Sequence, residues 1–414
     1  MTSKPRRSVL VVGGGIGGLA AALALAQKGT AVRVLEQAPE FKEIGAGIQL
    51  GPNIFRMFEC LGITDEVNRF AVLPENLMML DSVTGQEVTR ISLGSEFRSK
   101  FKYPYAVIHR GDLHRVLLAA CQQDELVELC PATKIEAVEE RSGAIVAITD
   151  KGDRQSADAL IGADGLWSTI RPLIVNDGKP TVSGHIAYRA VLPTSEMPEH
   201  LRWQSMVLWA GEKTHLVHYP LRGGGLFNLV AVFHSDKYEE GWDSFGDADE
   251  LHKRFACTCS EVRTLLAKID SWRMWVLCDR APVKQWSRGP MTLLGDAAHP
   301  MLQYLAQGAG MAIEDAVCIA DCVDEAEGDF TSAFQAYQTA RYLRTGRVQI
   351  TARVYGEFFH ASGVARELRN MFLGGRAQHD ALQSMEWLYG EQPGLGRTFP
   401  KHNTDRPALA NARG

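Results

Sequence analysis

The chain has 414 residues and a mass of 45.6 kDa, more than the roughly 250–300 residues that one hydrophobic core can serve, so a single small module is excluded. Hydrophobic residues make up 45% of the sequence and charged residues 22%, the composition of a folded protein rather than a disordered one. The formal net charge of −5 argues against a protein that neutralises a nucleic-acid backbone over a wide surface.

The first structural signal is a cluster of glycines near the N-terminus. Residues 8–12 form an apolar, β-branched run, five glycines fall within 13–18, and an Ala- and Leu-rich run follows over 19–27. Because glycines break an apolar helix, residues 8–27 are not expected to form a membrane span or a signal peptide. They predict a strand, a turn and a helix, and residues 31–36 add a second strand. These elements form the β-α-β unit of a parallel, doubly wound sheet.

The glycine spacing in this turn is also the first functional signal. Gly13, Gly15 and Gly18 follow the pattern Gly-x-Gly-x-x-Gly, in which backbone N–H groups approach a pyrophosphate at a helix N-terminus. Glu36 ends the second strand, 18 residues after Gly18, where a carboxylate accepts hydrogen bonds from a ribose hydroxyl group. Strand, helix and acid together predict that these four residues bind an adenine dinucleotide.

The rest of the chain continues the alternation of strand and helix and then changes character. Strand-like runs separated by turn residues predict an antiparallel sheet in an inserted domain, after which the chain returns to the first domain. The predicted elements are a helix at 112–121, strands at 145–149 and 159–161, strands at 205–210, 215–219 and 225–234, a strand at 292–294, a helix at 310–323 and mostly helix over 333–390.

Two later motifs decide which dinucleotide is expected. Residues 162–165 read Gly-Ala-Asp-Gly and are followed by Ser168 and Arg171, and residues 295–300 read Gly-Asp-Ala-Ala-His-Pro. With these motifs in this order after the first glycine motif, the chain resembles the single-component flavin-dependent aromatic hydroxylases over residues 8–390.

That resemblance implies a bound FAD, with NADH and O2 as co-substrates. It assigns Asp296 to the ribityl chain of the flavin, Arg110 to the charge of the pyrophosphate, and Asp164 to the same cofactor site. It also assigns a role to the start of a helix, whose N-terminal amides are expected to stabilise negative charge on the reduced flavin. The residues at this helix start are Gly308, Ala309, Gly310 and Met311.

The resemblance implies an α/β fold: a Rossmann-like FAD-binding domain with an inserted antiparallel-sheet substrate domain and C-terminal helices. The expected boundaries place the FAD-binding domain at 1–72, 106–180 and 286–345, the substrate domain at 73–105 and 181–285, the C-terminal helices at 346–390 and a loosely ordered tail at 391–414.

Further matches to the family lie in segments expected to line the substrate pocket. His215 and Tyr219 are four residues apart in a strand-like run and so share one face, whereas His218 points to the other. The resemblance implies that His215 helps to deprotonate a substrate phenol while Gln303 orients the same hydroxyl group. Tyr105, Tyr219 and Gln49 are expected to bind the substrate.

The tyrosines are expected to hold the substrate carboxylate, because Arg222 is the one Arg or Lys within the matched segments. The open alternative for Tyr105 and Tyr219 is that both are packing residues with backbone partners.

The expected reaction is hydroxylation of a hydroxybenzoate para to its hydroxyl group, as part of aromatic catabolism. Two alternatives stay open: a decarboxylative hydroxylase of the salicylate or 6-hydroxynicotinate type, and a flavin-binding reductase that never hydroxylates. The eight scattered cysteines fit a reducing cytoplasm and lack zinc spacing, so no metal is expected. The expected partners are a small aromatic acid and a second copy in a homodimer, without nucleic acid or a membrane anchor. Four arginines, Arg341, Arg344, Arg347 and Arg353, are expected on a solvated or dimer-facing surface.

Overall fold

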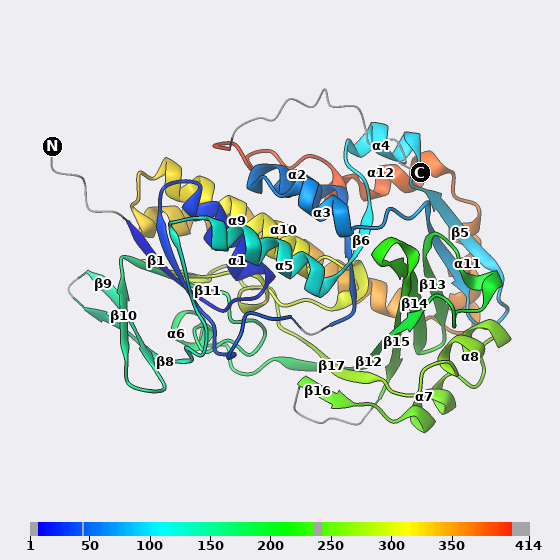
Figure 1. Cartoon of the computed structure of the whole chain (residues 1–414). Coiled ribbons are helices and arrows are strands. Elements are labelled where there is room, and N and C mark those ends of the chain that lie inside the picture. Colours follow the sequence, from blue (N-terminus) through cyan, green and yellow to red (C-terminus); the bar gives the residue numbers. More distant parts are fainter. Residues whose placement is uncertain (1–6, 44, 142, 236–241, 400–414) are drawn as a thin grey trace.

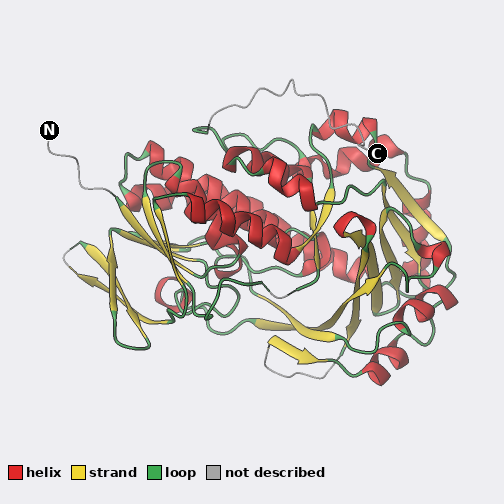
Figure 2. Cartoon of the chain, viewed as in Figure 1, coloured by secondary structure: helices red, strands yellow, loops and turns green. Residues whose placement is uncertain are grey.

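Two large β-sheets organise the computed structural model, which describes residues 7–43, 45–141, 143–235 and 242–399. Figure 1 places a six-stranded sheet at the left of the molecule and an eight-stranded sheet at the right. Helices α9 (Gly308–Glu325) and α10 (Phe330–Phe359) run between these regions, and Figure 2 shows how helix and sheet alternate through the molecule. This arrangement confirms the predicted α/β class.

The six-stranded sheet contains the predicted β-α-β unit. Strand β1 lies parallel to β2 on one side and to β11 on the other, and only the edge pair β18–β19 is antiparallel. Strands buried on both faces need continuous apolar, β-branched runs, which the sequence supplies here. The strand order is β18 (Ser287–Arg288), β19 (Met291–Leu293), β11 (Ala159–Gly162), β1 (Ser8–Val12), β2 (Ala31–Leu35) and β7 (Val127–Cys130).

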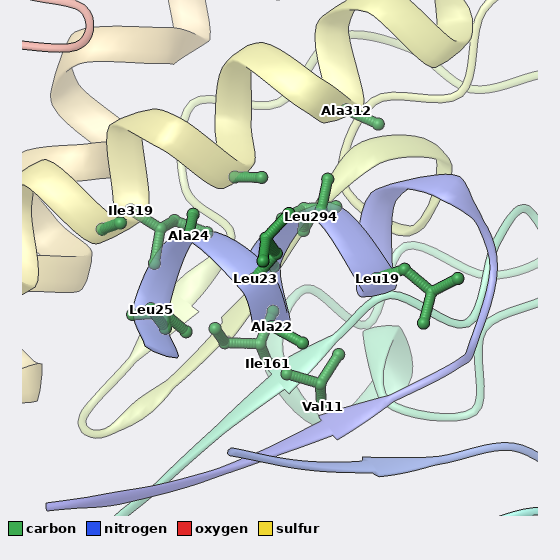
Figure 3. Close-up of a cluster of buried hydrophobic side chains, with 14 of the residues drawn as sticks. Val11, Leu19, Ala22, Leu23, Ala24, Leu25, Ile161, Leu294, Ala312 and Ile319 are labelled. Carbon is green, nitrogen blue, oxygen red and sulfur yellow. The ribbon is translucent and has the colours of Figure 1, made fainter. Parts of the chain in front are cut away.

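Helix α1 (Ile16–Ala26) lies between this sheet and helix α9. Figure 3 shows Val11 and Ile161 of the strands on one side of α1, and Ala312 and Ile319 of α9 on the other. A helix that is apolar on all sides must be buried on all sides. Every leucine of α1 is buried. Each buried leucine contributes about 1.5–3 kcal/mol, so the sheet and α9 fix the N-terminus of α1 firmly in place.

The eight-stranded sheet draws its strands from two separate stretches of the chain. Neighbouring strands are antiparallel except β4 and β13, which are parallel. The strands within 181–285 pair antiparallel with one another, as predicted, and β4, which comes from a segment far earlier in the chain, adds the one parallel pair of this sheet. The strand order is β16 (Trp242–Phe245), β17 (Arg273–Asp279), β12 (Thr181–Pro193), β15 (Leu226–His234), β14 (Thr214–Leu221), β13 (Ser205–Gly211), β4 (Asn76–Asp81) and β5 (Glu87–Ser92).

The two faces of this sheet differ in character. On one face, large apolar side chains such as Trp209 and Phe233 form a core that helices α7 (Ala248–Arg254) and α8 (Ser260–Leu266) cover. The opposite face looks toward α10, and we call it the polar face. The strand register places there His185 and Arg189 of β12, His215 and Tyr219 of β14, and Asn228 and His234 of β15.

The C-terminal helices are α10, α11 (Gly363–Gly374) and α12 (Gln378–Tyr389), as the helical pattern over 333–390 predicts. Their arginines correct an expectation. Arg341 is buried between Glu314 and Asp315, with N–O distances of 2.7 Å to each, and Arg344 lies 2.6 Å from Glu314. The expected solvated or dimer-facing surface is therefore wrong for these two arginines, because they neutralise buried carboxylates of α9.

The start of the tail is ordered, contrary to expectation. Within residues 391–399, Leu395 and Phe399 are buried, and the backbone N–H groups of Gly396 and Thr398 donate to the Asp321 carboxylate at 2.7 and 3.0 Å. A buried carboxylate on α9 needs hydrogen-bond donors, and the tail supplies them. The remainder of the predicted tail, 400–414, lies outside the described residues.

The other elements connect these layers. Strands β3 and β6 pair antiparallel, and β8, β9 and β10 form a small separate sheet. Within the described ranges, none of the helices has the length and hydropathy needed to cross a membrane. The remaining elements are β3 (Gly47–Leu50), α2 (Pro52–Leu61), α3 (Thr64–Phe70), α4 (Ser95–Phe101), β6 (Ala106–His109), α5 (Arg110–Gln123), β8 (Ile135–Arg141), β9 (Ala144–Thr149), β10 (Arg154–Ala157), α6 (Arg171–Ile174) and the 3-10 helices η1 (Glu199–Leu201), η2 (Arg222–Gly224), η3 (Gly295–Ala297) and η4 (Gln303–Leu305).

Candidate active site

The glycine turn between β1 and α1 is too tight for side chains. Gly13 has a φ of 109°, and a Cβ atom there would lie 2.4 Å from the Ala163 carbonyl oxygen. A Cβ atom on Gly18 would lie 2.0 Å from the Gly13 carbonyl oxygen. At Gly15 a Cβ atom would make only an ordinary contact, 3.5 Å from Glu43 Oε1, and no side chain caps the N-terminus of α1. A turn of bare backbone before an uncapped helix N-terminus is the geometry that a pyrophosphate needs.

Glu36 lies beside this loop, directly after β2. Its carboxylate accepts hydrogen bonds from the backbone N–H groups of Gly14 and Ala38, each at 2.7 Å. The structure therefore brings Glu36 together with the glycine motif at the edge where a ribose is expected.

The motif around Asp164 ties two loops together. The Asp164 carboxylate accepts hydrogen bonds from the backbone N–H groups of Thr169 and Ile170 at 2.7 and 3.2 Å, while its Oδ1 atom is buried without a partner. Arg171 donates to the carbonyl oxygens of Ala297 and Ala298, both at 2.7 Å. The motif at 162–171 thus supports the motif at 295–300, and one acceptor atom of Asp164 is left available to a ligand.

Asp296 is an exposed residue of η3. Neighbouring protein atoms nevertheless raise the pKa of its carboxyl group, and the charge of Arg110 opposes this rise. Gly308 lies close by, since a Cβ atom there would be 3.8 Å from Asp296 Oδ1. Helix α9 begins at Gly308 without a side-chain cap or an acidic residue in its first turn. Asp296 therefore lies beside the first residue of α9.

Arg110 begins helix α5 and forms an ion pair with Glu43, with N–O distances of 2.9 and 3.0 Å. It also acts electrostatically on Asp296. Arg110, Asp296, the glycine loop and the start of α9 fit FAD: a turn too narrow for Cβ atoms at Gly13 and Gly18, an exposed carboxylate beside the start of α9, and two uncapped helix N-termini.

Three predicted substrate residues come together at the edge of the polar face. The Tyr105 hydroxyl group donates to the Gln49 side-chain oxygen. Tyr219 packs against β3, where a Cβ atom on Gly47 would lie 2.5 Å from its ring. Burial raises the pKa of both tyrosines, so each hydroxyl group stays protonated as a hydrogen-bond donor at neutral pH.

His215 lies further along the same face of β14. It is 3% exposed, its ring centroid lies 5.4 Å from that of Tyr304, and its Nδ1 atom is 2.7 Å from Nε2 of His360. Burial lowers the pKa of His215 to about 3, so its imidazole is neutral at physiological pH. A neutral imidazole is a hydrogen-bond acceptor, as the predicted role requires.

Gln303 begins η4, next to Tyr304, and the sequence reasoning missed its partner. Nη2 of Arg189 donates to the Gln303 side-chain oxygen, and the Nε atom of Arg189 is buried without a hydrogen-bond partner. Burial lowers the pKa of Arg189 to about 10, so its guanidinium remains charged at neutral pH. The polar face thus contains a cation that the matched segments did not include.

Arg222, the arginine that those segments did include, is engaged elsewhere. Its Nε atom lies 3.0 Å from the Asp112 carboxylate of α5. The signal that would have found Arg189 is its spacing: His185 and Arg189 are four residues apart in one strand, as are His215 and Tyr219.

Comparison with protein families gives one match to most of the chain. The family described as "FAD binding domain" matches residues 6–328. Curated relatives include the 3-hydroxybenzoate 6-hydroxylase of Polaromonas naphthalenivorans, 45% identical over 92% of this chain and 95% of the relative. The enzyme of the same name from Klebsiella oxytoca is 44% identical over 92% of this chain and 96% of its own length.

More distant similarities concern other aromatic substrates. The 6-hydroxynicotinate 3-monooxygenase of Pseudomonas fluorescens is 34% identical over 84% of this chain and 90% of its own length. Among solved structures, a salicylate hydroxylase substrate complex has a TM-score of 0.81 at 25% identity and covers 99% of this chain and 100% of its own. Klebsiella pneumoniae HpxO complexed with FAD and uric acid has a TM-score of 0.81 at 24% identity over 93% and 97% of the two chains, a likeness of fold.

Proposed function

This chain belongs to the FAD-dependent aromatic hydroxylases and is an FAD-dependent monooxygenase, and from that premise we propose that it hydroxylates 3-hydroxybenzoate at carbon 6 to give gentisate, with NADH as the electron donor. The observation that carries the substrate is the full-length similarity to 3-hydroxybenzoate 6-hydroxylases. The arrangement of a neutral histidine and a protonated tyrosine on the polar face, with the protonated Tyr105 at its edge, supports it.

The cofactor site divides between backbone and side chains. The turn at Gly13, Gly15 and Gly18 and the N-terminus of α1 would hold the pyrophosphate with Arg110, and Glu36 would hold the ribose. Asp296 and the start of α9 at residues 308–311 would bind the flavin end, with Asp164 supporting the site. Bound FAD supplies the redox and oxygen-transfer chemistry, which no protein side chain provides.

The chain's own contribution is to bind, orient and ionise the substrate. A phenol has a pKa near 10, about that of tyrosine, so an adjacent acceptor assists its ionisation at neutral pH. His215 accepts the phenol proton, and the Gln303 amide group hydrogen-bonds the same oxygen. A phenolate donates electron density to the carbon para to it, which in 3-hydroxybenzoate is carbon 6. Ionisation by His215 therefore both activates the ring and selects the position of attack.

The carboxylate end of the substrate is held by tyrosine hydroxyl groups. Tyr105 and Tyr219 both interact with Gln49. A tyrosine hydroxyl group has one donor, so Tyr105 would exchange its bond to Gln49 for one to the substrate carboxylate, and Tyr219 would donate a second. Val230 and Val232 of the polar face, with Ala187, form an apolar cluster against which an aromatic ring can pack.

The assignment is tested by a screen of aromatic acids for stimulated NADH oxidation, with product identification by chromatography. The screen compares 3-hydroxybenzoate with salicylate and 6-hydroxynicotinate, the substrates of the decarboxylative alternatives. We expect gentisate from 3-hydroxybenzoate in a 1:1 ratio to NADH. Release of CO2 from salicylate or 6-hydroxynicotinate without gentisate would establish a decarboxylative hydroxylase, and NADH oxidation with no hydroxylated product would establish a reductase.

We also propose that the enzyme is a cytoplasmic homodimer. All eight cysteines are free, which fits a reducing compartment. Large apolar side chains are exposed on α10 and α11, among them Leu343 and Phe372 at 70% and 68% exposure, and a second copy would cover them. Analytical ultracentrifugation measures the mass in solution, and a monomer at micromolar concentration would contradict the dimer.

A further inference from the structure

Four histidine rings gather at one end of the polar face. His185, His215 and His234 come from three adjacent strands, and His360 follows the C-terminus of α10. Ring centroids of neighbouring histidines lie 4.1 to 5.3 Å apart. The proposed function uses one of these rings, His215, and gives no role to the others.

Three of the rings form a continuous hydrogen-bonded chain. Nδ1 of His215 lies 2.7 Å from Nε2 of His360, and Nδ1 of His360 lies 2.9 Å from Nε2 of His234. A neutral imidazole has one N–H donor and one acceptor nitrogen. Because both nitrogens of His360 are engaged, the donors of the three rings must all point in the same direction along the chain.

The chain runs from the protein interior toward the surface. His215 and His360 are 3% and 5% exposed, whereas His234 is only half-buried at the end of β15. The Nε2 edge of His215, opposite its bond to His360, is left for the substrate phenol. One end of the chain therefore meets the proposed substrate and the other approaches water.

Neutral histidines in this position cannot store the substrate's proton. Burial lowers the pKa of His215 to about 3, and it also lowers the pKa values of His360 and His234. The charged groups that act on the chain are Glu357, which raises the pKa of His234, and Lys213, Arg254 and Arg369, which together with His185 lower the pKa values of its members. An imidazolium is disfavoured throughout, so His215 can accept a proton at Nε2 only as it gives one up at Nδ1.

We propose that His360 and His234 form a relay that carries the proton of the substrate phenol from His215 to solvent. The phenol O–H bond breaks and a proton binds His215 Nε2. The Nδ1 proton of His215 passes to His360 Nε2, the Nδ1 proton of His360 passes to His234 Nε2, and the Nδ1 proton of His234 leaves to water. No charge accumulates on any ring. When the hydroxylated product regains its phenolic proton, the same steps run in reverse and restore the starting tautomers.

The relay rests on the proposed role of His215, and it assigns His360 and His234 as residues that act through it. His185 provides a matched control. It lies on the same face and its ring is 4.1 Å from that of His234, but its Nδ1 atom bonds to the Tyr304 hydroxyl group and not to a member of the chain. A change at His185 disturbs the cluster without interrupting the relay.

The test measures proton release when 3-hydroxybenzoate binds to the FAD-loaded enzyme, by stopped flow in weak buffer with a pH indicator and by phenolate absorbance. We expect His360→Ala and His234→Ala to slow ionisation by roughly 10²-fold or more, the scale of lost acid–base assistance, with FAD content retained. Added imidazole should restore the ionisation rate of His234→Ala, because that site is near solvent. The solvent isotope effect on ionisation should be smaller in both variants than in the parent. His185→Ala should ionise the substrate at the parent's rate.

Three results would overturn the relay. The first is a parental ionisation rate in both His360→Ala and His234→Ala, and the second is equal slowing in His185→Ala. The third is a stoichiometric transition metal in the purified parent, since nitrogen atoms of His185, His234 and His360 lie within 4.8 Å of one another and could bind one. Where a variant loses FAD, His360→Gln or His234→Gln replaces it. If the parent makes no gentisate, the substrate assignment fails, and the relay is measured with the phenolic acid that the screen identifies.

Discussion

The dinucleotide site and the polar face are built in opposite ways. At the dinucleotide site, the turn from Gly13 to Gly18 acts through its backbone, and contiguous motifs supply nearly every group. The polar face acts through side chains that three strands and the end of α10 bring together. Changes at the first region should therefore alter FAD retention, and changes at the second should alter aromatic binding and turnover with FAD retained.

The largest effect is expected at His215. His215→Leu removes the acceptor for the phenol proton at similar volume, and turnover of 3-hydroxybenzoate should fall by about 10²–10⁴-fold, the usual range for general-base assistance. FAD content, read from the flavin absorbance of the purified protein, should match that of the parent. The control is His218→Leu, on the other face of the same strand, where neither ring nitrogen has a partner. Equal losses of turnover in the two variants would contradict a specific role of His215 in the reaction.

The tyrosines should affect binding rather than chemistry. Tyr105→Phe and Tyr219→Phe keep the ring and delete the donor, and each should weaken binding of 3-hydroxybenzoate by about 1.5–3 kcal/mol, roughly 10- to 150-fold in Kd. Perturbation of the flavin spectrum during titration measures this Kd. Arg189→Met tests the competing cation on the same face. If it alone weakens binding while both tyrosine variants bind as the parent does, the carboxylate is held by Arg189.

The two regions also differ in how well they can be predicted from the sequence. The glycine turn, Glu36 and the start of α9 lie next to their own strands and helices, so local patterns predicted their placement. His215 and Tyr219 were predicted to share a face because strand side chains alternate. Their neighbours Arg189, His234 and His360 depend on strand register and on where a long helix ends, which a single sequence leaves undetermined. Arg341 was misassigned for the same reason, since its buried partners are on α9.

At the dinucleotide site, Gly18→Ala tests whether FAD binding depends on the close backbone approach between Gly18 and Gly13. The added Cβ atom would lie 2.0 Å from the Gly13 carbonyl oxygen, and relieving that overlap must move the loop. Overpacking of this kind costs about 1–3 kcal/mol, which would weaken FAD binding roughly 5- to 150-fold. The matched control is Gly29→Ala, at a φ of 78° with no atom near the added Cβ, which should retain FAD. Reconstitution of apoprotein with FAD, followed by fluorescence quenching, distinguishes the two.

The buried His218, on the apolar face of the eight-stranded sheet, should make the free energy of unfolding depend on pH. Burial lowers the pKa of His218 to about 3, whereas an unfolded histidine has a pKa of about 6.5. As pH falls from 6.5 toward 3, the unfolded chain binds a proton there that the folded chain does not, so stability falls. His218→Leu removes this term, which reaches about 2 kcal/mol near pH 5. Denaturant unfolding at pH 7.5, 6 and 5 should show a shallower decline in the variant than in the parent, and parallel declines would contradict it.

The smallest effect is expected at Arg222, which is outside both regions. Its guanidinium pairs with Asp112 of α5, and about half of its side chain is exposed to solvent. A partly exposed ion pair contributes roughly 0.2–1 kcal/mol, and Asp112 keeps a second partner in Arg115. Arg222→Gln should therefore lower the free energy of unfolding by less than about 1 kcal/mol, leaving the Kd values for FAD and 3-hydroxybenzoate unchanged. A 10-fold weaker aromatic Kd in this variant would instead make Arg222 a substrate ligand, and would mean that the binding surface extends beyond the strand end to η2.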